Sequence, residues 1–348
     1  MTPPWLLLGI AAALLPLSAW FSRWFSTPGS WFYILDHPNT RSLHHNPTPR
    51  SGGVAITAAF GAGWLAAALW FPPFRSTLWI GAGGLFLAGV SYLDDRRHLP
   101  APIRLGAHLG VASVAVGQGL LAPVFPWPAL DGLPLALPPA AAEILSLLFI
   151  VWCINLYNFM DGMDGFAGGM ALFGFGWMAW MGWQGGHLVF GVLNAMAACS
   201  AAGFLWLNFP PARLFMGDAG SSLLGYLAAV FSLWGALDGV APLWAFLLVF
   251  SPFWVDATVT LIHRGLKGEK VWVAHKTHYY QRLVQLGWGH RKTVLAEYGL
   301  MALTGGSALW GVGQDPAAQQ VLLAGWGGVY GVLMGLIHWR ERLTPPRQ

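Results

Sequence analysis

The sequence predicts an all-α integral membrane protein that forms a single domain over residues 1–348. Hydrophobic residues make up 56% of the chain and charged residues only 9%, which leaves too little polar surface for a water-soluble domain. Apolar windows follow one another along the chain, with short polar loops between them. Because no linker or long hydrophilic block interrupts this series, we expect one polytopic domain.

Eleven apolar windows are candidate membrane-spanning helices, since roughly 18 to 22 helical residues cross about 30 Å of hydrocarbon. An odd number of spans places the two ends of the chain on opposite sides of the membrane. The windows cover residues 4–22, 52–71, 77–93, 103–122, 140–157, 167–184, 187–207, 220–237, 241–262, 293–311 and 319–338.

The distribution of Lys and Arg predicts the orientation. With eleven spans the loops alternate between two sides, and 17 of the 18 basic residues fall on one side, with Arg75 on the other. Cytoplasmic loops carry the excess of Lys and Arg, so that side is cytoplasmic, the N-terminus is outside and the C-terminus is cytoplasmic. The same rule explains the net charge of +4. Without a basic stripe interleaved with aromatic residues, we expect no nucleic-acid partner.

The first cytoplasmic loop, residues 36–53, carries Arg41 and Arg50 among prolines and glycines that disfavour a regular helix. A stiff loop with two arginines is suited to hold an anionic group. The alternative is a basic loop that only follows the orientation rule.

Asp94 and Asp95 are adjacent at the cytoplasmic end of the third window. Neighbouring carboxylates repel each other unless a cation or a shared proton relieves the repulsion, so this pair indicates a divalent ion or phosphate chemistry. The alternative is simple pairing with Arg96 and Arg97, which follow directly.

The stretch 158–169 places Asn158, Asp161 and Asp164 between two apolar runs, with glycines at positions 162, 165, 168 and 169. These glycines predict a loop that leads into a helix and lets a ligand approach the backbone closely. The alternative is that the aspartates cap the sixth helix, although a cap needs one acid and has no use for Asn158.

Asp218 lies at a glycine-flanked turn directly before the eighth window, three residues after Phe215. The alternative role here is again an N-cap, for which Asp218, Ser221 and Ser222 are all ordinary candidates. The segment is not a phosphate-binding P-loop, because it lacks the GxxxxGK[ST] spacing.

The longest polar loop, residues 263–283, holds His275, Lys276 and His278. The i, i+3 spacing of the histidines is compatible with zinc, but no cysteine or third ligand lies at zinc spacing. In this basic setting we interpret both histidines as donors to phosphate, and Asp256, four residues after Pro252, is placed to reach the same loop. The alternative is a solvated basic loop.

Together these segments put carboxylates and cationic side chains on one side of the membrane. Carboxylates suit Mg²⁺, which shares its coordination sphere with substrate phosphates, while Arg, Lys and His suit the remaining phosphate oxygens. The combination indicates phosphoryl transfer at the cytoplasmic membrane surface. The main rival is a proton-coupled transporter, whose acids would lie near the middle of the bilayer instead of at cytoplasmic helix ends.

At these residues the chain resembles the polyprenyl-phosphate N-acetylaminosugar-1-phosphate transferases, and the resemblance covers nearly its whole length. It rests on the Asp94-Asp95 pair, on Asn158-Phe-Met-Asp-Gly-Met-Asp-Gly165, on Phe215-Met-Gly-Asp-Ala-Gly-Ser221 and on the histidine loop. The resemblance implies an enzyme of the bacterial cytoplasmic (inner) membrane. It would transfer an aminosugar 1-phosphate from a UDP-sugar to undecaprenyl (polyprenyl) phosphate and release UMP.

The resemblance also implies roles for single residues. Asp218 would bind Mg²⁺, with Mn²⁺ as a substitute, and Asp94 and Asp95 would lie at the metal and lipid-phosphate site. Arg50 would contact a phosphate. The other implied roles concern the donor substrate: Asn158 and Asp161 at the nucleotide, Phe215 near the uracil, Asp164 supporting that pocket, and His275, Lys276 and His278 on the diphosphate or sugar side.

One departure from the family pattern concerns the histidine loop. The peptidoglycan translocases carry a contiguous run of histidines there, whereas this chain has His275-Lys-Thr-His278, which is closer to the O-antigen and common-antigen initiators. Peptidoglycan lipid I synthesis therefore becomes the alternative, and UDP-GlcNAc, UDP-FucNAc and UDP-QuiNAc stay open as donors. A homodimer also stays open.

Overall fold

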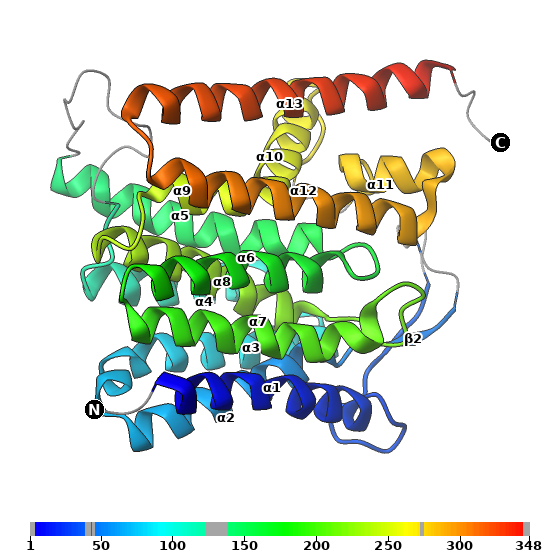
Figure 1. Cartoon of the computed structure of the whole chain (residues 1–348). Coiled ribbons are helices and arrows are strands. Elements are labelled where there is room, and N and C mark those ends of the chain that lie inside the picture. Colours follow the sequence, from blue (N-terminus) through cyan, green and yellow to red (C-terminus); the bar gives the residue numbers. More distant parts are fainter. Residues whose placement is uncertain (1–3, 39–42, 44–45, 123–137, 272–274, 344–348) are drawn as a thin grey trace.

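The computed structural model describes residues 4–38, 43, 46–122, 138–271 and 275–343. Helices running side by side form one bundle, with α1 along one edge and α12 and α13 along the opposite edge (Figure 1). The two short strands, β1 (Leu35–Asp36) and β2 (Thr48–Pro49), pair antiparallel beside one end of the bundle. Arg41, one of the two loop arginines, lies outside the described residues.

Each of the eleven apolar windows coincides with helical structure. The long helices are α1 (Pro4–Phe25), α2 (Gly52–Trp70), α3 (Leu78–Arg97), α4 (Ala101–Gly117), α5 (Pro139–Met160), α6 (Phe166–Gln184), α7 (Leu188–Asn208), α8 (Asp218–Leu237), α10 (Ser251–Leu266), α12 (Gly289–Val312) and α13 (Pro316–Leu343). The short elements are the 3-10 helix η1 (Pro72–Thr77), α9 (Leu243–Val249), α11 (Tyr279–Leu283) and the π-helix η2 (Val284–Trp288).

In the described part of the chain, seven helices are long and apolar enough to cross a membrane, or eight if the bent pair α9 and α10 counts as one span. The prediction of an all-α, multi-pass membrane protein is therefore confirmed. The count of eleven spans, the orientation and the single-domain division stay predictions. The apolar helix α4 falls short of the usual spanning length, because its 17 residues end before the window does.

The ninth window, residues 241–262, is not one straight helix, because α9 and α10 meet at an angle of 81°. Phe250 leaves the helical region between them, with φ −92° and ψ 7°. Pro252 then occupies the first turn of α10, where its missing N–H could not have continued the hydrogen bonds of α9. The bend directs α10 out of the row of helices and towards α13 (Figure 1).

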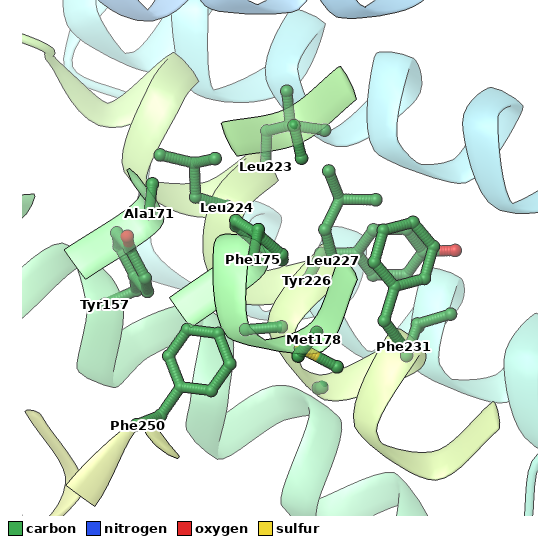
Figure 2. Packing of buried hydrophobic residues seen from close by; sticks show 14 of the residues in the cluster. Tyr157, Ala171, Phe175, Met178, Leu223, Leu224, Tyr226, Leu227, Phe231 and Phe250 are labelled. Carbon is green, nitrogen blue, oxygen red and sulfur yellow. The ribbon is translucent and has the colours of Figure 1, made fainter. Parts of the chain in front are cut away.

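Helix α8 lies at the centre of the hydrophobic core, and 83% of its apolar window is buried. Leu223, Leu227 and Phe231 of this helix pack with Phe175 and Met178 of α6 (Figure 2). A helix buried on every side holds its first residue in a fixed place. That first residue is Asp218.

A cavity of about 630 Å³ opens at the ends of the helices that are remote from Asp218. It is lined by η1, by the first turns of α3 and α7, by the turn that follows α4, and by the last turn of α8. Asp95 lies near the end of α3 and Asp218 at the start of α8, so the cavity and the predicted chemistry are at opposite ends of the bundle.

Candidate active site

The predicted carboxylates converge where α3 ends, α5 ends and α8 begins. The Oδ2 atom of Asp95 accepts the backbone N–H groups of Asp218 at 3.0 Å and Ala219 at 3.4 Å. Asp95 therefore caps α8 from another helix, since the N-cap position itself is Gly217, which has no side chain. The alternative in which Asp218 caps its own helix is wrong, and the Asp218 carboxylate is left for another task.

Arg50 supplies the positive charge beside this cap. Its Nη2 lies 3.3 Å from Oδ1 of Asp95 and donates to the backbone carbonyl of the same residue at 2.5 Å. Its Nη1 lies 3.6 Å from Asp36 Oδ1. The loop arginine thus reaches the carboxylate cluster, as its predicted anion-binding role requires.

The backbone of the Arg50 loop runs against the segment that precedes α8. Three hydrogen bonds join the two: Phe215 N to Pro49 O at 2.7 Å, Gly52 N to Phe215 O at 3.0 Å, and Gly53 N to Met216 O at 2.7 Å. A Cβ atom on Gly53 would lie 2.1 Å from the backbone nitrogen of Gly220, so only glycine allows this approach. The half-buried Phe215 is thereby fixed beside Arg50 and Asp218.

Asp94 points to a different partner from its neighbour. Its Oδ1 accepts the N–H of Leu99 at 2.6 Å, and its Oδ2 lies 3.0 Å from Nη1 of Arg104 on α4. Asp94 thus closes the turn between α3 and α4. The expected alternative pairing of this acidic pair with Arg96 and Arg97 is not the arrangement found, because Arg96 donates to the carbonyl of Trp31 instead.

Asn158 and Asp161 complete the cluster from the end of α5. The Asn158 amide donates to Ser221 Oγ on α8 at 3.0 Å. Asp161 follows the last residue of α5, and burial raises its pKa well above the usual range, with the nearby carboxylates of Asp218 and Asp95 raising it further. Three carboxylates therefore share one site with mutual repulsion, which a cation or a proton would relieve.

Asp164 lies apart from these three carboxylates. Its Oδ2 accepts the N–H of Ala212 at 3.0 Å, and its Oδ1 lies 3.1 Å from Nδ1 of His290 on α12. It therefore ties the glycine loop to the segment before α8. The helix that follows begins after Gly165 at φ 74°, so the aspartates do not cap it. The predicted support of the nucleotide pocket by Asp164 would be indirect.

The histidine loop is anchored by Asp256 of α10, as its sequence position suggested. Asp256 Oδ1 lies 3.2 Å from Nδ1 of His278 and accepts the N–H of Tyr279 at 2.9 Å, while Oδ2 accepts the N–H of Tyr280 at 3.0 Å. One buried carboxylate thus satisfies the first turn of α11 and orients the imidazole that precedes it.

Tyr280 joins the histidine loop to the Asp161 loop. Its ring lies nearly parallel to that of His278, with centroids 5.9 Å apart. Its hydroxyl donates to Phe159 O at 3.5 Å, and a Cβ on Gly162 would lie 2.3 Å from it. The glycine after Asp161 is therefore needed for the two loops to meet.

His275 and Lys276 lie at the outer side of this contact. The rings of His275 and His278 are 4.7 Å apart, and burial lowers the pKa of His275 to about 4, helped by the charges of His278 and Arg264. The Lys276 side chain is exposed. Among the described residues no group of three or more His, Cys, Asp or Glu has a metal-binding arrangement.

Comparisons with known proteins decide the family. A model described as glycosyl transferase family 4 matches residues 77–236. A probable undecaprenyl-phosphate N-acetylglucosaminyl 1-phosphate transferase of Bacillus subtilis (strain 168) is 34% identical over 267 residues, which cover 76% of this chain and 73% of the relative. The chain belongs to glycosyl transferase family 4.

Two further relatives show how far the likeness extends. A decaprenyl-phosphate N-acetylglucosaminephosphotransferase of Mycolicibacterium smegmatis is 30% identical over 362 residues, covering 95% of this chain and 87% of the relative. A phospho-N-acetylmuramoyl-pentapeptide-transferase of Mycobacterium ulcerans is 29% identical over 235 residues, covering 55% and 65%. The relatives are sugar-phosphate transferases, so the predicted superfamily is confirmed.

The family 4 match contains Asp94, Asp95, Asn158, Asp161 and Asp218, which the fold gathers around the start of α8. Arg50 and the histidine loop lie outside the matched region. They are joined to it by the Asp95 contact and by Tyr280. The roles of all these residues in catalysis stay predictions.

Sequence reasoning missed three residues that hold this family 4 site together: Arg104, Tyr280 and His290. Arg104 had a usable signal, because Pro100 directly precedes a new helix, so a basic residue in the first turn of α4 returns towards Asp94. Tyr280 and His290 had no signal in the sequence, since their partners Phe159 and Asp164 lie more than a hundred residues away in the chain.

Proposed function

We propose that the chain transfers an N-acetylaminosugar 1-phosphate from a UDP-sugar to polyprenyl phosphate at the cytoplasmic face of the bacterial inner membrane. An oxygen of the lipid phosphate attacks the sugar-linked phosphorus, and the bond from that phosphorus to the bridging oxygen breaks. UMP leaves with the bridging oxygen, and the lipid carries the sugar diphosphate. The observation that carries the proposal is the convergence of Asp95, Asp161 and Asp218 beside Arg50.

Mg²⁺ fits this donor set, with Mn²⁺ as a substitute. The three acids offer carboxylate oxygens, and Mg²⁺ is commonly held by one or two carboxylates together with substrate phosphates, so a preformed cage of three ligands is not required. Asp218 and Asp161 are the residues that would hold the ion, because Asp95 is engaged with the backbone of α8. The bound ion would neutralise phosphate charge.

The positions of the remaining site residues indicate which part of the substrates each would contact. Arg50 beside Asp95 is placed to contact a phosphate, and Arg104, in the first turn of α4, is partly exposed and faces Asp94 at the end of α3. Asn158 and Phe215 would hold the nucleotide, and His278 would donate to the diphosphate.

The named activities of the relatives favour one donor among the three that the sequence left open. Relatives with high coverage of this chain are named for N-acetylglucosamine 1-phosphate transfer. We therefore put UDP-GlcNAc first, and the start of a lipid-linked surface glycan such as O-antigen as the use of the product. The pentapeptide-transferase relative aligns with a smaller share of the chain, so lipid I synthesis is the second candidate.

The test is UMP release by the purified protein in lipid nanodiscs with polyprenyl phosphate and Mg²⁺. The donors are UDP-GlcNAc, UDP-FucNAc, UDP-QuiNAc and UDP-MurNAc-pentapeptide, each scored also for a lipid-linked sugar. We expect release with UDP-GlcNAc, its loss in Asp218→Asn, and its retention in Glu143→Gln, an exposed acid of α5. No release with any donor, together with solute counterflow in vesicles, would favour the transporter.

A further inference from the structure

Helix α13 contacts the rest of the bundle at few places. Only 11% of its apolar window is buried, and its buried residues in the described part are Tyr330 and Ile337. The Tyr330 hydroxyl lies 2.7 Å from Ser251 Oγ, at the first residue of α10 beside the 81° bend. A second polar contact lies near the C-terminal end of α13, where the helix passes α11 (Figure 1).

This second contact consists of Tyr279, Arg282, His338 and Glu341, which we name the Arg282 latch. Arg282 donates from Nε to Glu341 Oε1 at 2.7 Å and from Nη2 to Glu341 Oε2 at 2.5 Å. The guanidinium also lies 4.5 Å from the centre of the Tyr279 ring. A bidentate pair of this kind fixes both distance and angle, which a single surface ion pair does not.

His338 closes the latch on its other side. Its Nδ1 lies 2.8 Å from Arg282 Nη2, and its Nε2 lies 3.1 Å from the Tyr279 hydroxyl. Because a guanidinium only donates, Nδ1 must accept, and the ring must be neutral with its proton on Nε2. That proton is directed at the Tyr279 hydroxyl. Every polar atom of the imidazole is therefore used to hold α11.

Helix α11 presents its two sides to different neighbours. Tyr279 and Arg282 contact α13, whereas Tyr280 contacts Phe166 of α6 and the end of α5 at Phe159. The helix has only five residues, which is too short to be stable without such contacts. The position of His278, directly before it, therefore depends on Asp256 on one side and on the latch on the other.

We propose that the Arg282 latch is a positioning device for the active site, with Arg282, His338 and Glu341 as positioning residues that act through α11 on His278. The proposal rests on the proposed transferase function. Helix α13 contacts both the bend at Ser251 and the end of the histidine loop at Tyr279 and Arg282. It thus sets the position of His278 beside Tyr280, whose hydroxyl contacts the end of α5 at Phe159.

The test compares Arg282→Gln, Glu341→Gln and the double variant, with Glu143→Gln as the control for loss of an exposed acid. Each single variant should lower kcat by about tenfold with a smaller change in the KM for the UDP-sugar, since a shift of a catalytic group mainly costs transition-state binding. The double variant should lose no more than either single variant, because both changes break the same contact.

Amide hydrogen exchange gives a readout that does not depend on turnover. We expect faster exchange in the peptide covering residues 278–283 in all three variants, and no change in the peptide covering residues 218–224 or in Glu143→Gln. Unchanged exchange at residues 278–283 would overturn the latch as the support of α11. Faster exchange there with unchanged kcat would overturn its role in catalysis.

The same measurements separate this proposal from the transferase function. If the unaltered protein transfers no sugar phosphate, the proposed function fails and the catalytic role of the latch falls with it, while the exchange data still decide whether the latch holds α11. If only the variants lose transfer, and the double-variant losses multiply, the residues act separately and the latch is overturned.

Discussion

The carboxylate of Asp95 caps the helix that begins with Asp218, accepting its backbone N–H at 3.0 Å across 123 residues of sequence. The end of α3 and the start of α8 are thereby joined by a charged group at the point where the chemistry is proposed. The remaining oxygen, Oδ1, faces Arg50 at 3.3 Å. One side chain therefore both fixes a helix and contributes charge to the site.

Two substitutions of Asp95 should distinguish its role as the cap of α8 from its role as a charge in the site. Asp95→Asn keeps an oxygen for the α8 amides, so we expect normal thermal stability but UMP release reduced by at least about a hundredfold. Asp95→Ala removes the cap as well and should destabilise the protein by about 1 kcal/mol. Thermal unfolding in detergent and UMP release measure the two effects. Equal melting temperatures for the two variants would show that the cap contributes nothing.

Gly53 is expected to tolerate no side chain. In Gly53→Ala the new Cβ would lie 2.1 Å from Gly220 N, so α2 must move away from the start of α8. We expect a lowered melting temperature and a loss of UMP release. Gly61→Ala on the same helix is the matched control, because its Cβ would lie 3.5 Å from the Leu85 side chain, an ordinary contact. If both variants behave alike, the close approach of these helices is not required.

The raised pKa of the Asp161 carboxyl predicts that the stability of the fold depends on pH. Its folded-state pKa is raised, so the group favours folding below the usual range for aspartate, and that contribution is lost as the pH rises through the folded-state pKa. In EDTA, Asp161→Asn should therefore melt higher than the unaltered protein at pH 8 and show no advantage near pH 4. Glu143→Gln should show no such trend. A constant difference across the pH range would contradict the raised pKa.

Removal of divalent ions should act on the same carboxylates. EDTA should abolish UMP release, and Mg²⁺ or Mn²⁺ should restore it. The ion should also raise the melting temperature without substrate, because it relieves the repulsion among the acids. Asp218→Asn should lose both responses. Should Asp218→Asn keep the full Mg²⁺-dependent rise in melting temperature, the ion is bound elsewhere.

The sequence predicted the positions of the helices, but it did not predict which of two neighbouring acids contacts which partner. Apolar windows predicted helical structure throughout, and the grouping of Asp161 with Asp218 followed from their places at helix ends. Adjacent residues on a helix point about 100° apart, so only one of Asp94 and Asp95 can face α8. Which one does so depends on the rotation of α3 in the bundle, and no local pattern encodes that rotation.

The break at Phe250 illustrates a second limit. Pro252 was visible in the ninth window, but proline in the first turn of a helix is as ordinary as proline at a kink. Only the packing of Phe250 in the core against α6 shows that the chain turns there (Figure 2). Asp164 is a similar case, because its partners Ala212 and His290 come from two other segments.

The bend between α9 and α10 divides the site between two structural parts. The carboxylates belong to the tightly packed body around α8, whereas His278 is carried on an arm that Asp256 and α13 hold from outside. In the proposed function the histidine loop would meet the sugar, so substitutions in the arm would change the donor while Asp95, Asp161 and Asp218 keep their places at the start of α8, which gives a single scaffold a route to new donor specificities.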